Sequence, residues 1–361
     1  MIVWTAILTL LLSFGLSLLA VPLTQRLAWR LNFLDLPHRH KAHAKPIPLL
    51  SGSAIFAAIL LPSLLALALA CIWASTGAPA WLPQSLAVHI QGAAAKAPQA
   101  LAILGGAFLL HILGLIDDKR ALGPWIKLSV QIAVSAAVVI FFNVRILTLA
   151  GDAVSIVATI LWLTVITNAF NFLDNMDGLA AGVAAICAAA LLAASASIGQ
   201  IFVSAWLCLI LGALLGFLPY NFPPASTFMG DAGSLVIGFL LGAVSCLTTY
   251  VSPGTVGGHY ALFVPLVLMA VPLYDTISVI SLRIRERKNP MIGDRRHFSH
   301  RLVRRGMSER SAVLTVYLCT AGTAMSATLL PHVTSTGAVL VLGQTVAILL
   351  IIALLESGEA K

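Results

Sequence analysis

Residues 153–197 read AVSIVATILWLTVITNAFNFLDNMDGLAAGVAAICAAALLAASAS, an apolar run, a polar segment and a second apolar run. Each apolar run approaches the roughly 20 residues that an α-helix needs to cross the hydrocarbon core of a bilayer. The segment between them, 168–178, holds amides and carboxylates that are costly near a membrane. The pattern predicts two transmembrane helices joined by a short polar connection that lines a site.

The same pattern extends over the whole chain of 361 residues, which is 60% hydrophobic and only 9% charged. Further apolar runs bring the expected number of transmembrane helices to about eleven. They lie near 2–22, 50–72, 99–116, 126–142, 153–169, 179–197, 200–218, 233–250, 260–282, 311–329 and 335–355. We therefore expect an all-α, polytopic integral membrane protein with a single domain, 1–361, in the cell (inner) membrane. Gly212-x-x-x-Gly216 and Gly238-x-x-x-Gly242 predict close helix packing.

The basic residues predict the orientation, because short cytoplasmic loops are enriched in Lys and Arg. With the N-terminus outside and the C-terminus cytoplasmic, most of these residues fall in two inner loops, 23–49 and 283–310. Only Lys96 and Arg145 remain outside. The net charge of +8 follows from this bias and from an anionic substrate, so no nucleic-acid partner is expected.

The inner loops hold nearly all the distinctive polar residues, and we expect them to form one active site. These loops are 23–49, 117–125, 168–178, 219–232 and 283–310. A transporter or flippase of a lipid-linked anion is the rival class, but it would place polar groups halfway along helices in two matching halves. A structural scaffold is a further alternative, and it would not need acidic residues together in these loops.

Asn171, Asp174 and Asp177 follow one another at intervals of three residues. Residues at this spacing lie on nearly one face if the segment is helical. Amide and carboxylate oxygens suit Mg²⁺, which takes one or two protein groups and uses substrate phosphates for the rest. The alternative is that an aspartate here caps the next helix.

The segment 228–234, FMGDAGS, opens another apolar helix. Its backbone N–H groups can hold phosphate oxygens. Asp231 would repel a bare phosphate, so its presence implies a bridging metal, and Phe228 is placed to stack on a flat ring. The alternative is a glycine-rich turn with an aspartate cap.

Asp117 and Asp118 are adjacent carboxylates at the end of an apolar run. Because they repel each other, they require a cation, a basic neighbour or a shared proton. One of them could bind or deprotonate a substrate phosphate. Lys127 lies within the next helix and needs an anionic partner, which either aspartate or a lipid headgroup would supply. The alternative is a helix end solvated by headgroups.

Two basic loops carry histidines. The last inner loop contains Arg295, His297 and His300, and arginine and histidine side chains bind phosphates and leaving-group oxygens. The first inner loop has a similar composition, with Lys41 and His43, and could close over a diphosphate. Asp275, within an apolar run, is interpreted as a structural partner of an arginine such as Arg283, and a catalytic role is the alternative.

In this order, Asp117-Asp118, Asn171-x-x-Asp174-x-x-Asp177-Gly178 and Phe228-Met-Gly-Asp231-x-Gly-Ser234 resemble the polyprenyl-phosphate N-acetylhexosamine-1-phosphate transferases. The combination is highly specific and the resemblance covers nearly the whole chain. That family includes transferases that start O-antigen (lipopolysaccharide), enterobacterial common antigen and wall teichoic acid synthesis, and the phospho-MurNAc-pentapeptide translocase. The resemblance implies transfer of a sugar 1-phosphate from a UDP-sugar to undecaprenyl phosphate within the lipid bilayer, with release of UMP. It also implies a requirement for Mg²⁺, for which Mn²⁺ would substitute, and leaves a homodimer open.

The resemblance also implies roles for individual residues. Asp231 would be the principal metal ligand, with Asn171. Phe228 would stack on uracil and Asp177 would contact the nucleoside. The catalytic set, including the residues that handle the lipid phosphate, would be Asp117, Asp118, Lys127 and Asp174. Further substrate-binding residues would be Lys41, His43, Arg295, His297 and His300. The chain departs from the family at Ser299, where a further histidine is often found.

The donor sugar follows from one absent motif. The chain lacks the run of adjacent histidines followed by Phe-Glu that is expected of the MurNAc-pentapeptide enzyme. A HexNAc-1-phosphate donor, most simply UDP-GlcNAc, is therefore favoured, and the translocase is the alternative. A two-step route through an aspartyl intermediate on Asp117 or Asp118 stays open beside direct transfer.

Overall fold

Long helices make up almost all of the protein in a computed structural model, which describes residues 2–36, 46–251, 256, 258–287 and 297–357. Ten described helices are long and apolar enough to cross a membrane: α1 (Ile2–Leu31), α2 (Ser51–Thr76), α5 (Ala97–Lys119), α6 (Pro124–Phe142), α7 (Asp152–Leu173), α8 (Leu179–Ser197), α9 (Ile201–Asn221), α10 (Gly230–Leu247), α14 (Glu309–Leu329) and α15 (Ser335–Ser357). The shorter elements are β1 (Leu34–Asp35), β2 (Ile47–Pro48), α3 (Gln84–Ala87), α4 (Ile90–Ala95), η1 (Thr148–Ala150), η2 (Gly258–Phe263), α11 (Val264–Leu268), α12 (Ala270–Arg285), α13 (Phe298–Arg304) and η3 (Leu330–His332). The predicted all-α, polytopic membrane fold is confirmed.

The apolar run predicted over 260–282 is not one straight helix. The segment Gly258–Leu268 and the helix α12 are bent by 61° at Met269 and together make up the eleventh candidate span. Proline explains the position of the break, because its ring clashes with the carbonyl four residues earlier and it lacks an N–H group. For Pro272 that carbonyl belongs to Leu268, the last residue before the break.

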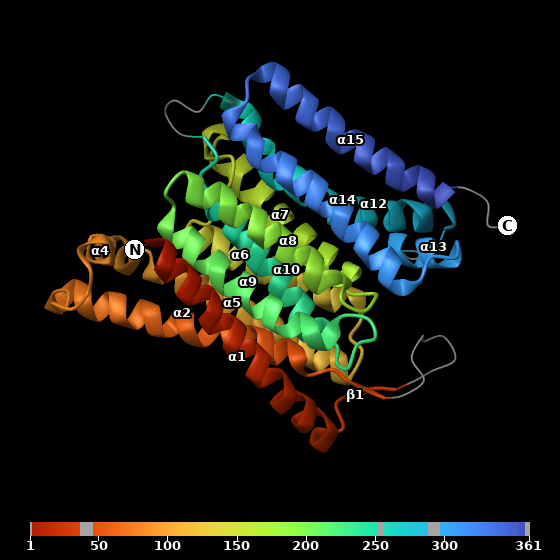
Figure 1. The fold of residues 1–361 in the computed structure, drawn as a ribbon, viewed down its shortest axis with the longest axis horizontal. Helices are drawn as coiled ribbons and strands as arrows, with labels where there is room; N and C mark the ends of the chain where they lie inside the picture. The colour runs from red at the N-terminus through yellow and green to blue at the C-terminus, as the bar shows by residue number, and fades with distance from the viewer. Residues whose placement is uncertain (1, 37–45, 252–255, 257, 288–296, 358–361) are drawn as a thin grey trace.

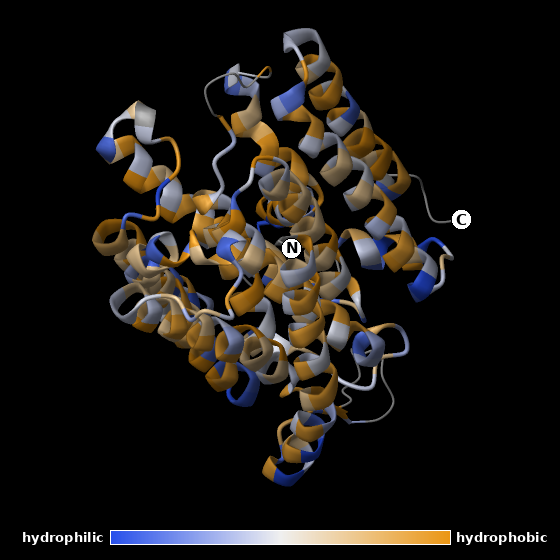
Figure 2. Cartoon of the chain, turned by 60° about the vertical axis from the view of Figure 1, so that its left-hand side comes forward, coloured by the Kyte–Doolittle hydropathy of each residue, from blue (hydrophilic) through white to orange (hydrophobic). Residues whose placement is uncertain are grey.

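The outer surface of the bundle is apolar, as a lipid-facing surface requires. Figure 2 shows hydrophobic residues along most of the length of the helices. Large apolar side chains that are more than half exposed include Leu8 on α1, Phe141 on α6 and Leu354 on α15. Such exposure would be unfavourable in water and is expected where the solvent is hydrocarbon.

Helix α10 lies at the centre of the bundle (Figure 1) and packs against α2, α5 and α7. Small residues allow the close approach that the glycine spacings predict. A Cβ atom on Gly212 or Gly216 of α9 would collide with main-chain atoms of α1, and one on Gly238 would collide with Thr167 of α7. Close packing at these two motifs is therefore confirmed.

The two ends of the chain lie at opposite ends of the bundle. Figure 1 shows the start of α1 on the left, whereas β1, α13 and the end of α15 lie toward the right. An odd number of membrane spans places the two termini on opposite sides of the membrane. The strands β1 and β2 pair antiparallel, with Leu34 opposite Pro48, and lie toward the right-hand end with the end of α1. Which end is cytoplasmic stays a prediction from the basic residues.

Candidate active site

Four charged side chains meet where the end of α5, the start of α6 and the start of α10 come together. We call Asp117, Asp118, Lys127 and Asp231 the carboxylate junction. The Lys127 Nζ atom lies 2.9 Å from Oδ2 of Asp117 and 2.6 Å from Oδ2 of Asp231. The lysine therefore bridges two carboxylates that lie 114 positions apart in the sequence.

 The expectation that Lys127 finds an anionic partner is met by Asp117, and Asp231 is a second partner that the sequence did not indicate.

Asp118 has a different environment from its neighbour Asp117. Its Oδ1 accepts a hydrogen bond from the Asp231 N–H at 2.8 Å, and its Oδ2 accepts one from the Ala232 N–H at 3.1 Å. The first N–H groups of a helix have no partner within the helix, so this carboxylate caps α10 from another helix. Asp118 thereby fixes the backbone that carries Asp231.

Two glycines allow this contact. Gly230 has a φ of +64°, and a Cβ atom there would lie 2.5 Å from Oδ2 of Asp118. A Cβ atom on Gly114 of α5 would collide with the backbone of Asp231 and Ala232. The end of α5 can therefore approach the start of α10 only because these positions lack side chains.

The end of α7 supplies further oxygen and nitrogen atoms. Asn171 donates from Nδ2 to Ser234 Oγ on α10 at 2.9 Å, which leaves its carbonyl oxygen as the atom suited to a cation. Asp174 follows the last residue of α7 and is half-buried. Burial raises the pKa of Asp174 well above its usual value, and the nearby negative charges of Asp231 and Asp118, with that of Asp177, raise it further.

Asp177 holds the connection between α9 and α10. Its Oδ2 accepts a hydrogen bond from the Ala225 N–H at 2.8 Å. Beside it, the Gly178 N–H donates to Asn221 Oδ1 at 3.0 Å. The segments 168–178 and 219–232 are therefore bound to each other, as their predicted place in one site requires.

Phe228 lies next to strand β2, near the end of the segment 23–49. The Phe228 N–H donates to the carbonyl oxygen of Pro48, at the end of β2, at 2.9 Å. The Thr227 hydroxyl donates to the same oxygen, also at 2.9 Å. The ring of Phe228 is half-buried, at the edge of the segment that starts α10.

Helix α13 brings His297 into a buried contact with α12. Oδ2 of Asp275 lies 2.8 Å from Nδ1 of His297, and Oδ1 accepts the Phe298 N–H at 2.8 Å. Two residues along, the Ser299 hydroxyl donates to Asn175 Oδ1 at 2.6 Å. The His297 ring thus lies beside the segment 168–178, with its centroid 6.2 Å from that of Phe172.

The structure brings most of the predicted site residues together. Hydrogen bonds or electrostatic interactions connect Asp117, Asp118, Lys127, Asn171, Asp174, Asp177, Phe228, Asp231 and His297 to neighbouring segments of this end of the bundle. His300 is half-buried on α13 and takes part in an interaction of its own. Lys41, His43 and Arg295 lie outside the described residues.

The residues present fit a divalent cation. Carboxylate oxygens of Asp117 and Asp231 already hold a positive charge between them, that of Lys127. Among the described residues, no three His, Cys, Asp or Glu side chains are arranged to hold a metal ion by themselves. Mg²⁺ commonly binds one or two carboxylates and completes its shell with water and substrate phosphates. The arrangement suits an ion of this kind, and the ion itself stays a prediction.

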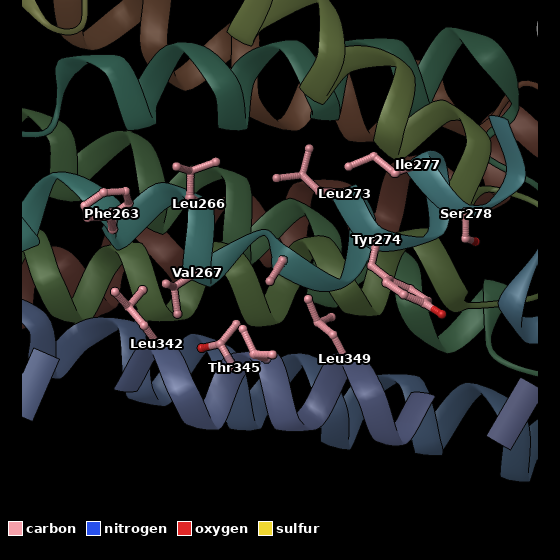
Figure 3. A pocket seen from close by; sticks show the side chains of 12 residues that line it. Phe263, Leu266, Val267, Leu273, Tyr274, Ile277, Ser278, Leu342, Thr345 and Leu349 are labelled. Carbon is pink, nitrogen blue, oxygen red and sulfur yellow. The ribbon is translucent and has the colours of Figure 1, made fainter. Parts of the chain in front are cut away.

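An apolar cavity lies away from these charges. It has a volume of about 370 Å³ and lies between α12 and α15, with α11 at one end. Figure 3 shows Leu273, Tyr274 and Leu349 among the side chains that line it. The only hydroxyl groups in its wall belong to Tyr274, Ser278 and Thr345. The wall of this cavity is almost entirely apolar, in contrast to the carboxylate junction.

Three residues that hold α13 beside the site were not identified from the sequence. Asp275 was expected to pair with an arginine, whereas the structure pairs it with His297. The sequence did not predict the hydrogen bond between Ser299 and Asn175, which joins α13 to the segment 168–178. For the contact of Asp275 with His297, the only signal in the sequence was an aspartate within an apolar run, because its partner lies 22 residues away in another element.

Comparison with known proteins gives consistent matches. The family described as "Glycosyl transferase family 4" matches residues 100–249. The chain is 31% identical over 318 residues to the "Probable undecaprenyl-phosphate N-acetylglucosaminyl 1-phosphate transferase" of Bacillus subtilis (strain 168), covering 85% of this chain and 80% of that protein. It is 34% identical over 323 residues to the "Decaprenyl-phosphate N-acetylglucosaminephosphotransferase" of Mycolicibacterium smegmatis, covering 81% and 74%. It is 25% identical over 314 residues to the "Undecaprenyl-phosphate alpha-N-acetylglucosaminyl 1-phosphate transferase" of Escherichia coli (strain K12), covering 82% and 76%.

Proposed function

Because this chain belongs to glycosyl transferase family 4, among the polyprenyl-phosphate N-acetylglucosamine-1-phosphate transferases, we propose that it transfers GlcNAc 1-phosphate from UDP-GlcNAc to undecaprenyl phosphate. UMP is the second product, and the reaction requires Mg²⁺. The protein is a multi-pass membrane protein, so the lipid acceptor reaches the site from the bilayer. The product is a polyprenyl-diphosphate sugar that starts a cell-envelope glycan.

The carboxylate junction is the observation that carries this proposal. Three aspartates and one lysine from α5, α6 and α10 meet at helix ends rather than halfway across the bundle. This position suits a reaction between a water-soluble nucleotide and a membrane-embedded phosphate. It does not suit a transporter, whose polar groups would lie near the middle of the membrane.

The chemistry is a displacement at phosphorus. An oxygen of undecaprenyl phosphate forms a bond to the sugar-bearing phosphorus, and the bond from that phosphorus to the oxygen of UMP breaks, so the electron pair leaves with UMP. Both substrates are anions, and the first barrier is their mutual repulsion. Bound Mg²⁺ supplies positive charge that reduces this repulsion and stabilises the leaving group. Asp231 and Asn171 would hold the ion.

Lys127 binds the lipid phosphate. A lysine ammonium group has three N–H donors, and Asp117 and Asp231 accept two of them. The third is available for a phosphate oxygen of the acceptor. Asp117, whose Oδ1 also accepts the Leu122 N–H at 2.6 Å, keeps the ammonium group in place and takes the proton of a singly protonated lipid phosphate.

Asp118 has a supporting role in this scheme. Both of its oxygens accept backbone N–H groups at the start of α10, so it positions Asp231 instead of contacting the substrate. Sequence alone did not distinguish the two adjacent aspartates. The geometry favours Asp117 over Asp118 as the group that faces the lipid phosphate.

The nucleotide binds on the side of the α9–α10 connection. Phe228 stacks on the uracil, and Asp177 contacts the nucleoside while holding the Ala225 N–H. His297 and His300 on α13 bind the diphosphate or the sugar, together with Arg295, Lys41 and His43 from the basic loops. Asp174 adds a further carboxyl group between the α9–α10 connection and α13.

The experiment is a transfer assay with purified protein in detergent. UDP-GlcNAc, undecaprenyl phosphate and Mg²⁺ are supplied together, and UMP release and the lipid-linked product are both measured. We expect UMP only when both substrates and the metal are present. UMP release without the lipid, or no lipid-linked product with a complete mixture, would contradict the proposal. UDP-MurNAc-pentapeptide as donor tests the translocase alternative, for which we expect no transfer.

A further inference from the structure

We propose that Asp275 is a positioning residue for the transfer reaction, acting through His297. This inference rests on the proposed function and adds to it a residue outside the inner loops. Asp275 lies on α12, in the span that contains the bend, and is only 2% exposed. His297, at the start of α13, is 4% exposed.

The two oxygens of Asp275 have separate partners. Oδ1 accepts the Phe298 N–H, the first N–H of α13, at 2.8 Å, which fixes the start of this helix. Oδ2 lies 2.8 Å from Nδ1 of His297. One carboxylate therefore sets both where α13 begins and how the imidazole is turned.

The contact also determines which nitrogen of His297 carries a proton. A carboxylate only accepts hydrogen bonds, so Nδ1 must be the N–H that faces it. In the neutral ring, Nε2 is then the nitrogen with the lone pair, and it is the atom left to interact with a substrate. A side chain that donated toward Nδ1 would reverse this arrangement.

The position of α13 places the His297 ring beside the acidic segment 168–178. Ser299 donates to Asn175, which lies between Asp174 and Asp177, and the His297 ring packs beside Phe172 in the same segment. His297 is therefore held from α12 on one side and lies next to the acidic segment 168–178 on the other. Its role in binding the donor depends on that placement.

Capping and positioning predict different results for substitution by asparagine. An asparagine can still accept the Phe298 N–H through its carbonyl oxygen, so the start of α13 is retained. Its amide group would face Nδ1 with a donor, and this favours the other tautomer of His297. Asp275→Asn therefore separates the two roles, and Asp275→Ala removes both.

The test compares these two variants with the wild type in the transfer assay. We expect Asp275→Asn to lower kcat about 10- to 100-fold, the usual cost of losing a group that orients a functional histidine. Its KM for undecaprenyl phosphate and its thermal unfolding temperature should stay at the wild-type values. Asp275→Ala should lower kcat by a similar factor and also lower the unfolding temperature.

Two controls make the result decisive. In a His297→Ala background, Asp275→Asn should cost no further activity, because its effect passes through the histidine. Ser278→Ala removes the hydrogen bond from Arg301 between the same two helices without touching His297, so it should leave kcat unchanged. Wild-type kcat in Asp275→Asn, additive losses in the double variant, or an equal loss in Ser278→Ala would overturn the inference. An inactive wild type would instead refute the proposed function.

Discussion

The carboxylate junction and the α12–α13 contact both hold aspartates, but they balance charge differently. At the junction, one lysine serves Asp117 and Asp231, and these side chains stay partly exposed. At the α12–α13 contact, Asp275 is almost fully buried and both its oxygens have partners, His297 and the Phe298 N–H. An excess of negative charge marks the place that attracts a cation, whereas a buried, fully paired carboxylate fixes the position of another group.

The largest expected effect is that of Asp231→Asn, which removes a negative charge from the carboxylate junction. We expect kcat to fall about 10³-fold or more, as when a charge-stabilising group is lost from an active site. The measurement is UMP release by protein that remains monodisperse in size-exclusion chromatography. Asp152→Asn is a matched control, because this exposed aspartate pairs with Arg145 at the start of α7, and its activity should be normal. Near-normal turnover of Asp231→Asn would remove Asp231 from the metal site.

Lys127→Met should give the second-largest effect. It leaves Asp117 and Asp231 without their shared cation and removes the donor for the lipid phosphate. We expect kcat/KM for undecaprenyl phosphate to fall about 10²-fold. Steady-state kinetics with varied lipid checks this, and a loss confined to the KM for UDP-GlcNAc would place the lysine on the donor side instead.

Phe228→Ala tests the nucleotide side, away from the junction. Loss of an aromatic stacking contact with a base costs about 1–3 kcal/mol, so the KM for UDP-GlcNAc should rise about 10-fold with little change in kcat. Phe228→Tyr keeps the ring and serves as the control. An unchanged KM in the alanine variant would exclude stacking on uracil.

The two adjacent aspartates should separate when stability is measured. Asp118→Ala removes the cap of α10 and should lower the free energy of unfolding by about 1 kcal/mol, whereas Asp118→Asn keeps an acceptor and should lower it less. Asp117→Ala should reduce activity more than stability. Thermal unfolding in detergent, run beside the transfer assay, compares them. A more stable Asp118→Ala variant would contradict the capping role.

The smallest effect concerns Asp174 and depends on pH. Its pKa is raised in the folded protein, so the folded state keeps a proton that the unfolded chain releases, and Asp174 lowers stability as pH rises from its unfolded pKa toward its folded pKa. Asp174→Asn should therefore be more stable than the wild type near neutral pH. The difference should vanish below the usual carboxyl pKa of about 3.9. Unfolding temperatures over a pH series measure it, and a less stable variant at neutral pH would show that the carboxylate is stabilised.

Much of this arrangement was predictable from sequence. Apolar runs located the spans, and glycine spacings located close helix contacts, because both depend only on local composition. The pairing of Lys127 with Asp117 was predictable since the two residues are ten positions apart across a short turn. The bend at Met269 was missed, although Pro272 explains it afterwards.

The remainder depends on how distant helices are turned toward each other. Lys127 and Asp231 lie 104 positions apart, and only the packing of α10 against α5 brings them into contact. The same holds for Asp275 and His297, whose pairing depends on where α13 docks. The different roles of Asp117 and Asp118 follow from their positions around the last turn of α5, which composition does not reveal.

The most direct measurement is to locate Mn²⁺ by anomalous scattering in crystals of the protein with UDP-GlcNAc. We expect a peak bound to the Asp231 carboxylate and to the diphosphate of the donor, with the uracil on Phe228. A metal peak at other side chains, or a donor bound away from the carboxylate junction, would contradict the account.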